Sequence, residues 1–195
     1  MFTIVGLGNP GDEYKNTRHN IGWIILGEIL SKHNLPSLIK SSQYTALISE
    51  GVLSGKEVGI IFPTAFMNNS GVSIQRYVSD RSSLEKLIVV HDDIDLPFGE
   101  IKISYGRGAG GHNGVRSIID ECGATSFIRI RVGIAQRGFF GGIKRPTGEK
   151  LSKYVLGIFT KKEINSLPDI VEHVDIAIKH IFEKGVSYAM QEGNK

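Results

Sequence analysis

Apolar and polar residues follow two periods along this chain, and each period predicts a different kind of element. Residues 87–90 are a continuous apolar run, which is typical of a central strand covered on both faces of a sheet, and residues 2–7 predict a buried strand. Residues 127–134 alternate apolar side chains with arginines, which predicts a strand with one basic face. Residues 21–33 have apolar side chains at helical spacing, and residues 161–190 predict one or two amphipathic helices.

Shorter segments continue this alternation of strands and helices. Two strands joined through Ser54 and Gly55 are expected to form a hairpin. The remaining elements that we expect are strands over residues 43–49, 57–62 and 100–105 and helices over residues 70–79, 115–122 and 151–156. Strands that alternate with helices predict an α/β fold, so we expect a single globular domain over residues 1–195, with a mixed central β-sheet surrounded by helices.

The loop after the first strand contains Gly6, Gly8 and Gly11, which match the G-x-G-x-x-G spacing of dinucleotide-binding loops. Such a site also needs a helix that begins at the third glycine, with its N-terminus facing the pyrophosphate. Residues 12–20 are mostly charged and polar and have no apolar face, so they do not predict that helix. We therefore expect a loop that presents three polar or aromatic side chains at the end of a strand: Asn9, Tyr14 and His19.

Composition narrows the class of protein. The single cysteine, Cys122, rules out an internal disulfide, and its apolar helical context predicts a buried residue rather than a nucleophile. No apolar run reaches the roughly 18 residues that a membrane span needs, and the sequence begins without the features of a signal peptide. We therefore expect a cytoplasmic protein with no membrane partner. We also expect a monomer, because no long exposed apolar face demands a partner.

Positive charge is concentrated in one part of the chain. Residues 96–155 contain ten basic and four acidic side chains, a net charge of +6, whereas the whole chain carries only +3. Within this span, residues 136–150 form an aperiodic basic loop that includes Lys144 and is predicted to be mobile. Such asymmetry indicates a polyanionic partner such as nucleic acid, and a merely solvated surface is the alternative.

Polar side chains gather at the predicted ends of several strands. A histidine near a carboxylate is the minimum equipment for activating water as a nucleophile, because the carboxylate orients the ring and raises its basicity. Side-chain amides can bind a carbonyl group or stabilise an oxyanion. No serine or cysteine has the context of an activated nucleophile. The residues indicate a hydrolase that uses water, better suited to an ester than to an amide, with these candidates at one mouth: His19, Asp92, Asn9, Asn68 and Asn113.

The same residues carry a resemblance that covers nearly the whole chain. Residues 4–11 (IVGLGNPG) with Tyr14 and residues 17–20 (TRHN), residues 63–68 (PTAFMN), residues 91–97 (HDDIDLP) and residues 110–114 (GGHNG) resemble bacterial peptidyl-tRNA hydrolase. The resemblance implies an enzyme that hydrolyses the ester between peptide and tRNA in peptidyl-tRNA and so recycles tRNA after premature drop-off. It implies no metal and no organic cofactor.

The resemblance also implies residue roles. His19 would be the catalytic base and Asp92 its partner, while Asn9, Asn68 and Asn113 would bind the peptide and the substrate end. Tyr14, Phe66 and Met67 would shape the wall around the ester. The glycine-rich residues 106–111 would act as a gate or as a plain hinge.

Basic residues near the glycine-rich segment and on the following strand would grip tRNA phosphate. Arg131 matches the second of these positions. At the first, the chain has Ser104 where a lysine is expected, and Lys102 and Arg107 flank it. The expected tRNA-binding residues are therefore Lys102, Arg107 and Arg131.

Two other functions remain open on the sequence alone. The first is a metallohydrolase, because the chain offers enough nitrogen and oxygen ligands for a divalent metal at His19, His91, Asp92, Asp93, Asp95 and His112. However, no helical histidine pair of the H-x-x-x-H type is present. The second is an RNA-binding relative without turnover, which would not need to retain both His19 and Asp92.

Overall fold

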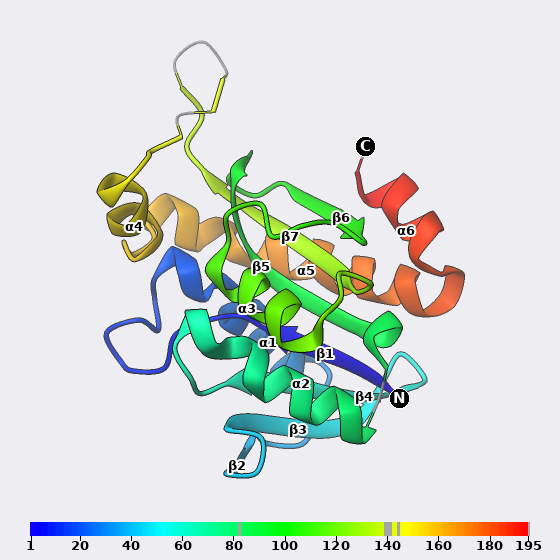
Figure 1. Ribbon diagram of the computed structural model, residues 1–195. Helices are drawn as coiled ribbons and strands as arrows, with labels where there is room; N and C mark the ends of the chain where they lie inside the picture. The colour runs from blue at the N-terminus through cyan, green and yellow to red at the C-terminus, as the bar shows by residue number, and fades with distance from the viewer. Residues whose placement is uncertain (82, 139–141, 144, 195) are drawn as a thin grey trace.

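The protein is built on a seven-stranded mixed sheet with the strand order β2-β3-β4-β1-β5-β7-β6. The computed structural model describes residues 1–81, 83–138, 142–143 and 145–194 (Figure 1). The strands are β1 Phe2–Gly6, β2 Ile39–Ser41, β3 Ala46–Leu53, β4 Lys56–Pro63, β5 Leu87–Pro97, β6 Ile101–Tyr105 and β7 Ile128–Ala135. Part of the loop predicted to be mobile, namely residues 139–141 and Lys144, lies outside the described residues.

The four central strands run in the same direction. β1 pairs in parallel with β4 and with β5, and β5 pairs in parallel with β7. The outer pairings are antiparallel, including the β3–β4 hairpin that the sequence predicted. The carboxyl ends of β4, β1, β5 and β7 therefore meet at one edge of the sheet, where ligands bind in open α/β sheets.

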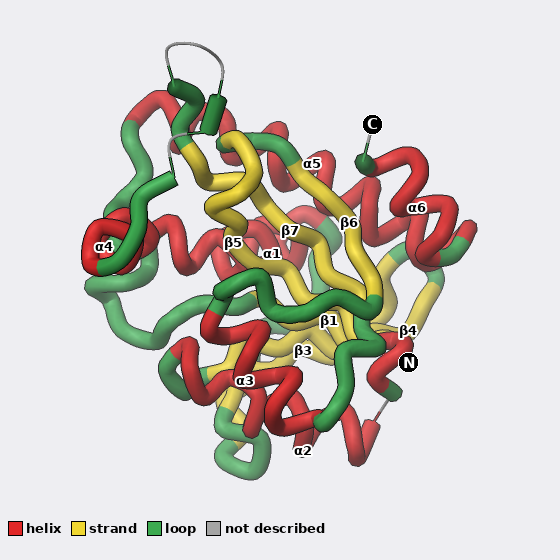
Figure 2. The backbone as a smooth tube through the Cα atoms, turned by 45° about the horizontal axis from the view of Figure 1, so that its top comes forward, coloured by secondary structure: helices red, strands yellow, loops and turns green. Residues whose placement is uncertain are grey.

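Helices cover both faces of the sheet, which confirms the predicted fold class (Figures 1 and 2). α1 and α5 pack on one face, α2 and α3 pack on the other, and α6 lies beside the edge strand β6. Apolar side chains from both faces of the buried strands fill these two layers. The helices are α1 Ile21–Lys32, α2 Ser70–Arg81, α3 Asn113–Cys122, α4 Glu149–Val155, α5 Lys161–Lys184 and α6 Val186–Gly193, with 3-10 turns at Arg18–Asn20, Met67–Asn69 and Leu84–Lys86.

The structure corrects two element predictions and decides a third, which had left open one or two C-terminal helices. β5 continues past the predicted apolar run to Pro97, because β7 keeps pairing with it, so His91 and Asp92 lie within the strand. β2 was not predicted, since three residues are too short to show a period. The C-terminal helical segment is divided at Gly185, whose φ of 82° ends α5 before α6 begins.

Close backbone packing places the start of α1 against the sheet. A Cβ atom on Gly22 would lie 2.4 Å from the carbonyl oxygen of Val90, and one on Gly6 would lie 2.7 Å from the carbonyl oxygen of Gly22. Only glycine permits this approach at both positions. As a result, the turn that precedes α1, and with it His19, lies directly beside the end of the apolar part of β5.

Cys122 differs in part from its prediction. It lies at the end of α3 and is half-buried rather than fully buried. Burial, with a smaller contribution from Glu121, raises the pKa of its thiol to about 11. The thiol is therefore protonated at neutral pH, so it lacks the thiolate that a nucleophile needs. Within the described part of the chain, no helix is both long and apolar enough to cross a membrane.

Candidate active site

A cleft of about 580 Å³ opens at the edge where the parallel strands end. Five of the eleven residues predicted from sequence line the cleft: His19, Asp92, Arg107, Asn113 and Arg131. The other six lie outside its lining: Asn9, Tyr14, Phe66, Met67, Asn68 and Lys102. The glycine-rich loop that follows β6 forms one wall of the cleft, and α4 contributes to another.

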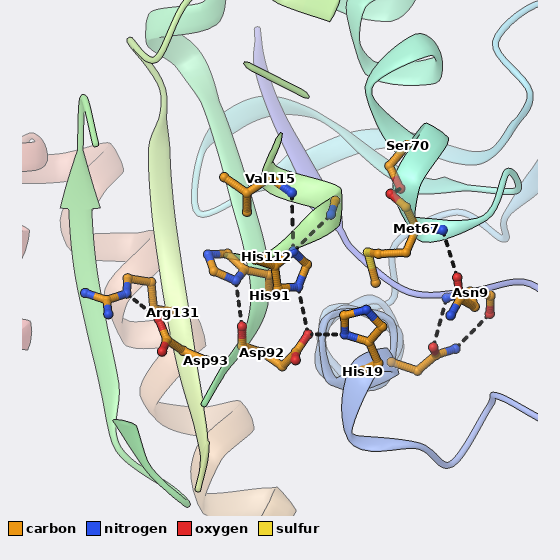
Figure 3. Close-up of polar contacts among 12 residues, drawn as sticks. Asn9, His19, Met67, Ser70, His91, Asp92, Asp93, His112, Val115 and Arg131 are labelled. Atoms are coloured by element: carbon orange, nitrogen blue, oxygen red, sulfur yellow. Dashed lines mark hydrogen bonds and ion pairs between the residues drawn. The ribbon is translucent and has the colours of Figure 1, made fainter. Parts of the chain in front are cut away.

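His19 and Asp92 meet as the sequence predicted. His19 Nδ1 donates a hydrogen bond of 2.8 Å to Asp92 Oδ1, and the two side chains are only 11% and 3% exposed (Figure 3). His19 comes from the turn before α1, and Asp92 comes from β5. With the proton on Nδ1, the Nε2 atom of His19 carries the lone pair, and it has no hydrogen-bond partner among the described residues.

His112 is a second partner of Asp92, and its role was not predicted. Its Nε2 donates a 2.9 Å hydrogen bond to the same oxygen of Asp92 (Figure 3). Its Nδ1 accepts from the backbone N–H groups of Gly114 and Val115, at 3.1 and 3.3 Å, and so caps the N-terminus of α3. The sequence predicted that this helix begins only at Val115, three residues after His112, and serine, threonine, aspartate and asparagine are the usual caps, so the cap at His112 was missed.

Charge and hydrogen bonding keep Asp92 ionised despite its burial. Burial alone would raise the pKa of Asp92, but the attraction of His19 and His112 and their two hydrogen bonds hold that pKa far below its ordinary value. For His19 the balance has the opposite sign. Burial lowers its pKa, but the charge and hydrogen bond of Asp92 outweigh burial and raise the pKa above its ordinary value of 6.5.

His91 completes the group of histidines without contacting the carboxylate of Asp92. Its Nδ1 donates to the backbone carbonyl oxygen of Asp92 at 2.7 Å, and its ring lies 4.7 Å from that of His112. Burial, together with the nearby His112, lowers the pKa of His91 well below the ordinary value. His91 is therefore neutral at neutral pH.

The metal-binding alternative reduces to three side chains. Of the six candidate ligands, only His19, Asp92 and His112 bring ligand atoms within 4.8 Å of one another among the described residues. Both histidines direct protonated nitrogens at the same carboxylate oxygen, because Nδ1 of His112 is occupied as an acceptor. A metal ligand must offer a lone pair instead. The donor set therefore suits hydrogen bonding better than metal ligation.

Asn9 links three loops of the site. Its Oδ1 accepts a 2.8 Å hydrogen bond from the backbone N–H of Met67 (Figure 3). Asn20, which was not predicted, holds the backbone of Asn9 on both sides, accepting from its N–H and donating to its carbonyl, each at 2.9 Å. The Nδ2 group of Asn9 has no partner among the described residues, so it is the end that remains available as a donor.

The other predicted binding residues divide into exposed and buried ones. Phe66 is 57% exposed, and its ring lies edge-on to that of Tyr14 at 6.3 Å. Met67 was also expected on the wall, but it is only 4% exposed and packs against the start of α3. Asn68 and Asn113 are both exposed. The two aromatic rings are therefore the accessible apolar surface of these loops, whereas Met67 is buried.

Basic side chains lie on one face of β6 and β7. Lys102 is opposite Arg131 and Ser104 is opposite Arg129, so all four share a face of the sheet. Arg131 is held by Asp93, to which its Nε donates at 2.6 Å. Arg129 lines the cleft without a hydrogen bond or ion pair to the described chain, and burial, with the nearby Arg131, lowers its pKa. Sequence reasoning placed Arg129 on the basic face but not among the tRNA-binding residues.

Ion pairs neutralise part of the charge that the sequence concentrated here. Arg137 pairs with Glu100, and Arg145 pairs with Asp95 at 3.0 Å. Arg145, Arg107, Arg129 and Arg131 all line the cleft. Two of these arginines, Arg131 and Arg145, pair with aspartates that also line the cleft, so Arg107 and Arg129 are the lining arginines without an ion pair to the described chain.

Comparison with known proteins agrees with this geometry. The family model described as peptidyl-tRNA hydrolase matches residues 3–195. Peptidyl-tRNA hydrolase of Syntrophotalea carbinolica is 38% identical over 196 residues, covering 100% of this chain and 97% of that protein. The enzyme of the same name from Bacillus subtilis is 40% identical over 182 residues, covering 92% of this chain and 89% of that protein.

Solved structures give the same result. The crystal structure of peptidyl-tRNA hydrolase from Acinetobacter baumannii superposes with a TM-score of 0.88 at 30% identity, covering 100% of this chain and 94% of that one. The family match and the curated relatives both extend over nearly the whole chain. On these grounds the chain belongs to the peptidyl-tRNA hydrolase family and is a hydrolase.

Proposed function

We propose that this protein hydrolyses the ester bond between peptide and tRNA in peptidyl-tRNA, using a water molecule that His19 activates with the help of Asp92. The observation that carries the proposal is the buried contact between these two side chains, which leaves Nε2 of His19 as a base at the cleft. Release of the peptide would return the tRNA to translation.

The chemistry uses His19 first as a base and then as an acid. Its Nε2 takes a proton from water while the water oxygen attacks the ester carbonyl, and Asp92 stabilises the imidazolium that forms. The tetrahedral intermediate then collapses, the bond to the ribose oxygen breaks, and His19 returns its proton to that oxygen. His112 supports both steps, because its hydrogen bond keeps the carboxylate of Asp92 in place.

Side-chain amides would bind the peptide part of the substrate. Nδ2 of Asn9 and the exposed amides of Asn68 and Asn113 can bond to backbone carbonyl and N–H groups, which every peptide offers. The edge-on ring pair of Tyr14 and Phe66 would provide an apolar surface beside the ester. Recognition of backbone rather than side chains suits an enzyme that must accept many peptides.

The basic face would bind tRNA phosphate. Arg107 and Arg131 line the cleft, and Lys102 lies opposite Arg131 at its outer side. Binding should weaken steeply with salt if this face is used. Alanine substitution of Arg131 should reduce the slope of log tRNA affinity against log salt concentration by about one phosphate contact. Arg137 pairs with Glu100 outside the cleft lining, so its substitution should leave this slope nearly unchanged.

The deciding experiment is hydrolysis of an N-blocked aminoacyl-tRNA in excess chelator by the wild type, His19→Ala and His33→Ala. His33 is a matched control, because it also pairs with an aspartate but lies outside the cleft lining. Turnover that resists chelator and is lost only in His19→Ala would support the proposal. Turnover lost in chelator would favour a metal, and tight salt-sensitive tRNA binding without turnover would favour an RNA-binding protein.

A further inference from the structure

The turn that carries His19 is anchored on both sides. On one side, Asn20 is bonded to the backbone of Asn9. On the other side, Arg18 reaches away from the cleft to the first turn of α5, where it pairs with Glu163. We propose that Arg18 and Glu163 are positioning residues that hold His19 against Asp92, an inference that rests on the proposed role of His19 as the base.

The ion pair is almost completely enclosed. Arg18 Nη2 lies 2.9 Å from Glu163 Oε2, and the two side chains are only 7% and 10% exposed. The guanidinium also lies 4.7 Å from the ring centroid of Tyr154 and 5.6 Å from that of Phe159. A planar cation between two aromatic rings and a carboxylate has little freedom to move.

Glu163 is itself held by the start of its helix. Its Oε2 accepts from the backbone N–H of Thr160 at 2.7 Å, and its own N–H donates to Thr160 Oγ1 at 3.2 Å. This capping box fixes the carboxylate relative to α5. The carboxylate is therefore a fixed point to which Arg18 is attached, although the two residues are 145 positions apart in the chain.

Backbone contacts continue the attachment next to the ion pair. The N–H of Arg18 donates to the carbonyl oxygen of Gly157 at 3.0 Å, and Thr17 forms an isolated antiparallel bridge with Ile158. A Cβ atom on Gly157 would lie 3.1 Å from Arg18 Nη1, so a larger residue would press on the guanidinium. The segment between α4 and α5 thus runs against the turn that carries His19.

The pair is poorly designed for stability alone. Burying two charges costs desolvation, and apolar residues of similar size are often as stabilising. In addition, Nε of Arg18 is buried without a hydrogen-bond partner among the described atoms, which adds a further cost. A costly contact one residue from His19 is explained if it determines where the imidazole lies.

The test compares Glu163→Gln, Arg18→Met and the control Asp175→Asn. Asp175 is also on α5, but it pairs with Lys32 and His33 at the far end of α1. The ionisable groups that face His19 are Asp92 from β5 and His112 before α3, and no variant changes them. The readouts are the pKa of His19 by NMR titration, and kcat and KM for an N-blocked aminoacyl-tRNA.

We expect both site variants to lower the pKa of His19 and to reduce kcat by about 10- to 100-fold, with KM within about twofold of the wild type. A direct charge effect would act with opposite signs, because Glu163→Gln removes a negative charge and Arg18→Met removes a positive one. Asp175→Asn should change neither readout. Opposite pKa changes in the two site variants, an unchanged pKa in both, or equal losses in Asp175→Asn would overturn the inference.

A double variant, Arg18→Met/Glu163→Leu, replaces the pair with apolar side chains and leaves no unpaired buried charge. We expect it to melt close to the wild type and still to have the lowered kcat; a double variant with wild-type kcat and His19 pKa would refute positioning. The NMR titration needs no turnover, so it tests the positioning of His19 separately from the proposed function. Full activity in His19→Ala would reject His19 as the base, whatever the titration shows.

Discussion

Two histidine–aspartate pairs lie at opposite ends of α1, at the same separation and in different surroundings. His19 and Asp92 are 2.8 Å apart at its start, and His33 and Asp175 are 2.8 Å apart at its end. His33 is 30% exposed, and its aspartate is shared with Lys32, whereas Asp92 is 3% exposed and is shared with a second histidine. Distance alone therefore does not distinguish the two pairs, whereas burial and the competing partner do.

The competing partner explains the difference in chemistry. Lys32 is a permanent cation that neutralises Asp175. The carboxylate of Asp175 therefore serves several donors and is not reserved for His33. His112 donates one N–H to Asp92, and its other nitrogen is occupied as a helix cap. Burial lowers the pKa of His19, but the charge and hydrogen bond of Asp92 outweigh burial and raise that pKa above its ordinary value. We expect four measurements to separate the two pairs.

The largest effect should come from Asp92→Asn. Loss of the carboxylate removes the group that orients His19 and stabilises its imidazolium, so kcat should fall by about 10²- to 10⁴-fold. The equivalent change at the other pair, Asp175→Asn, should leave kcat within about twofold of the wild type. Hydrolysis of an N-blocked aminoacyl-tRNA measures both, and equal losses would abolish the distinction between the pairs.

A smaller effect should come from His112→Asn. Asparagine can still cap α3, but it is too short to reach Asp92, so the change removes one hydrogen bond to the carboxylate and keeps the helix. We expect kcat to fall about 10-fold with an almost unchanged melting temperature. Wild-type kcat in this variant would show that Asp92 needs only His19.

The pH dependence should report the first pair and not the second. His19 must be neutral to accept a proton, and its pKa is raised. The acid limb of the kcat/KM profile should therefore lie above pH 6.5 and fall about tenfold per pH unit below it. In Asp92→Asn only burial still shifts the pKa of His19, and burial lowers it. The acid limb of the residual activity should therefore lie at lower pH. His33→Ala should not move the limb; if it did, the assignment would be wrong.

The smallest effect should be that of the outer pair on stability. Ion pairs between partly exposed side chains contribute little, because water screens them. Thermal unfolding of Asp175→Asn should therefore show only a small decrease in melting temperature, with activity retained. A large loss of stability would mean that the contact between α1 and α5 depends on this pair rather than on apolar packing.

Much of the site was predictable because part of it is local. Continuous apolar runs identified the buried strands, and parallel strands end at a common edge, so loops that follow them were expected to meet there. This reasoning brought His19 and Asp92 together correctly. It also predicted the basic face of β7, because alternation along a strand fixes which side each arginine faces.

The amino-acid sequence by itself thus determined most of the elements, the sheet edge that carries the site and the family. Only the tertiary structure decided which partner each polar group takes: His112 on the carboxylate of Asp92, Met67 on the amide of Asn9, and Glu163 on Arg18. Periodicity is a property of neighbours in the chain, so it can be read locally. A hydrogen bond depends on the distance and direction between two groups, and those are set only when segments up to 145 residues apart pack together.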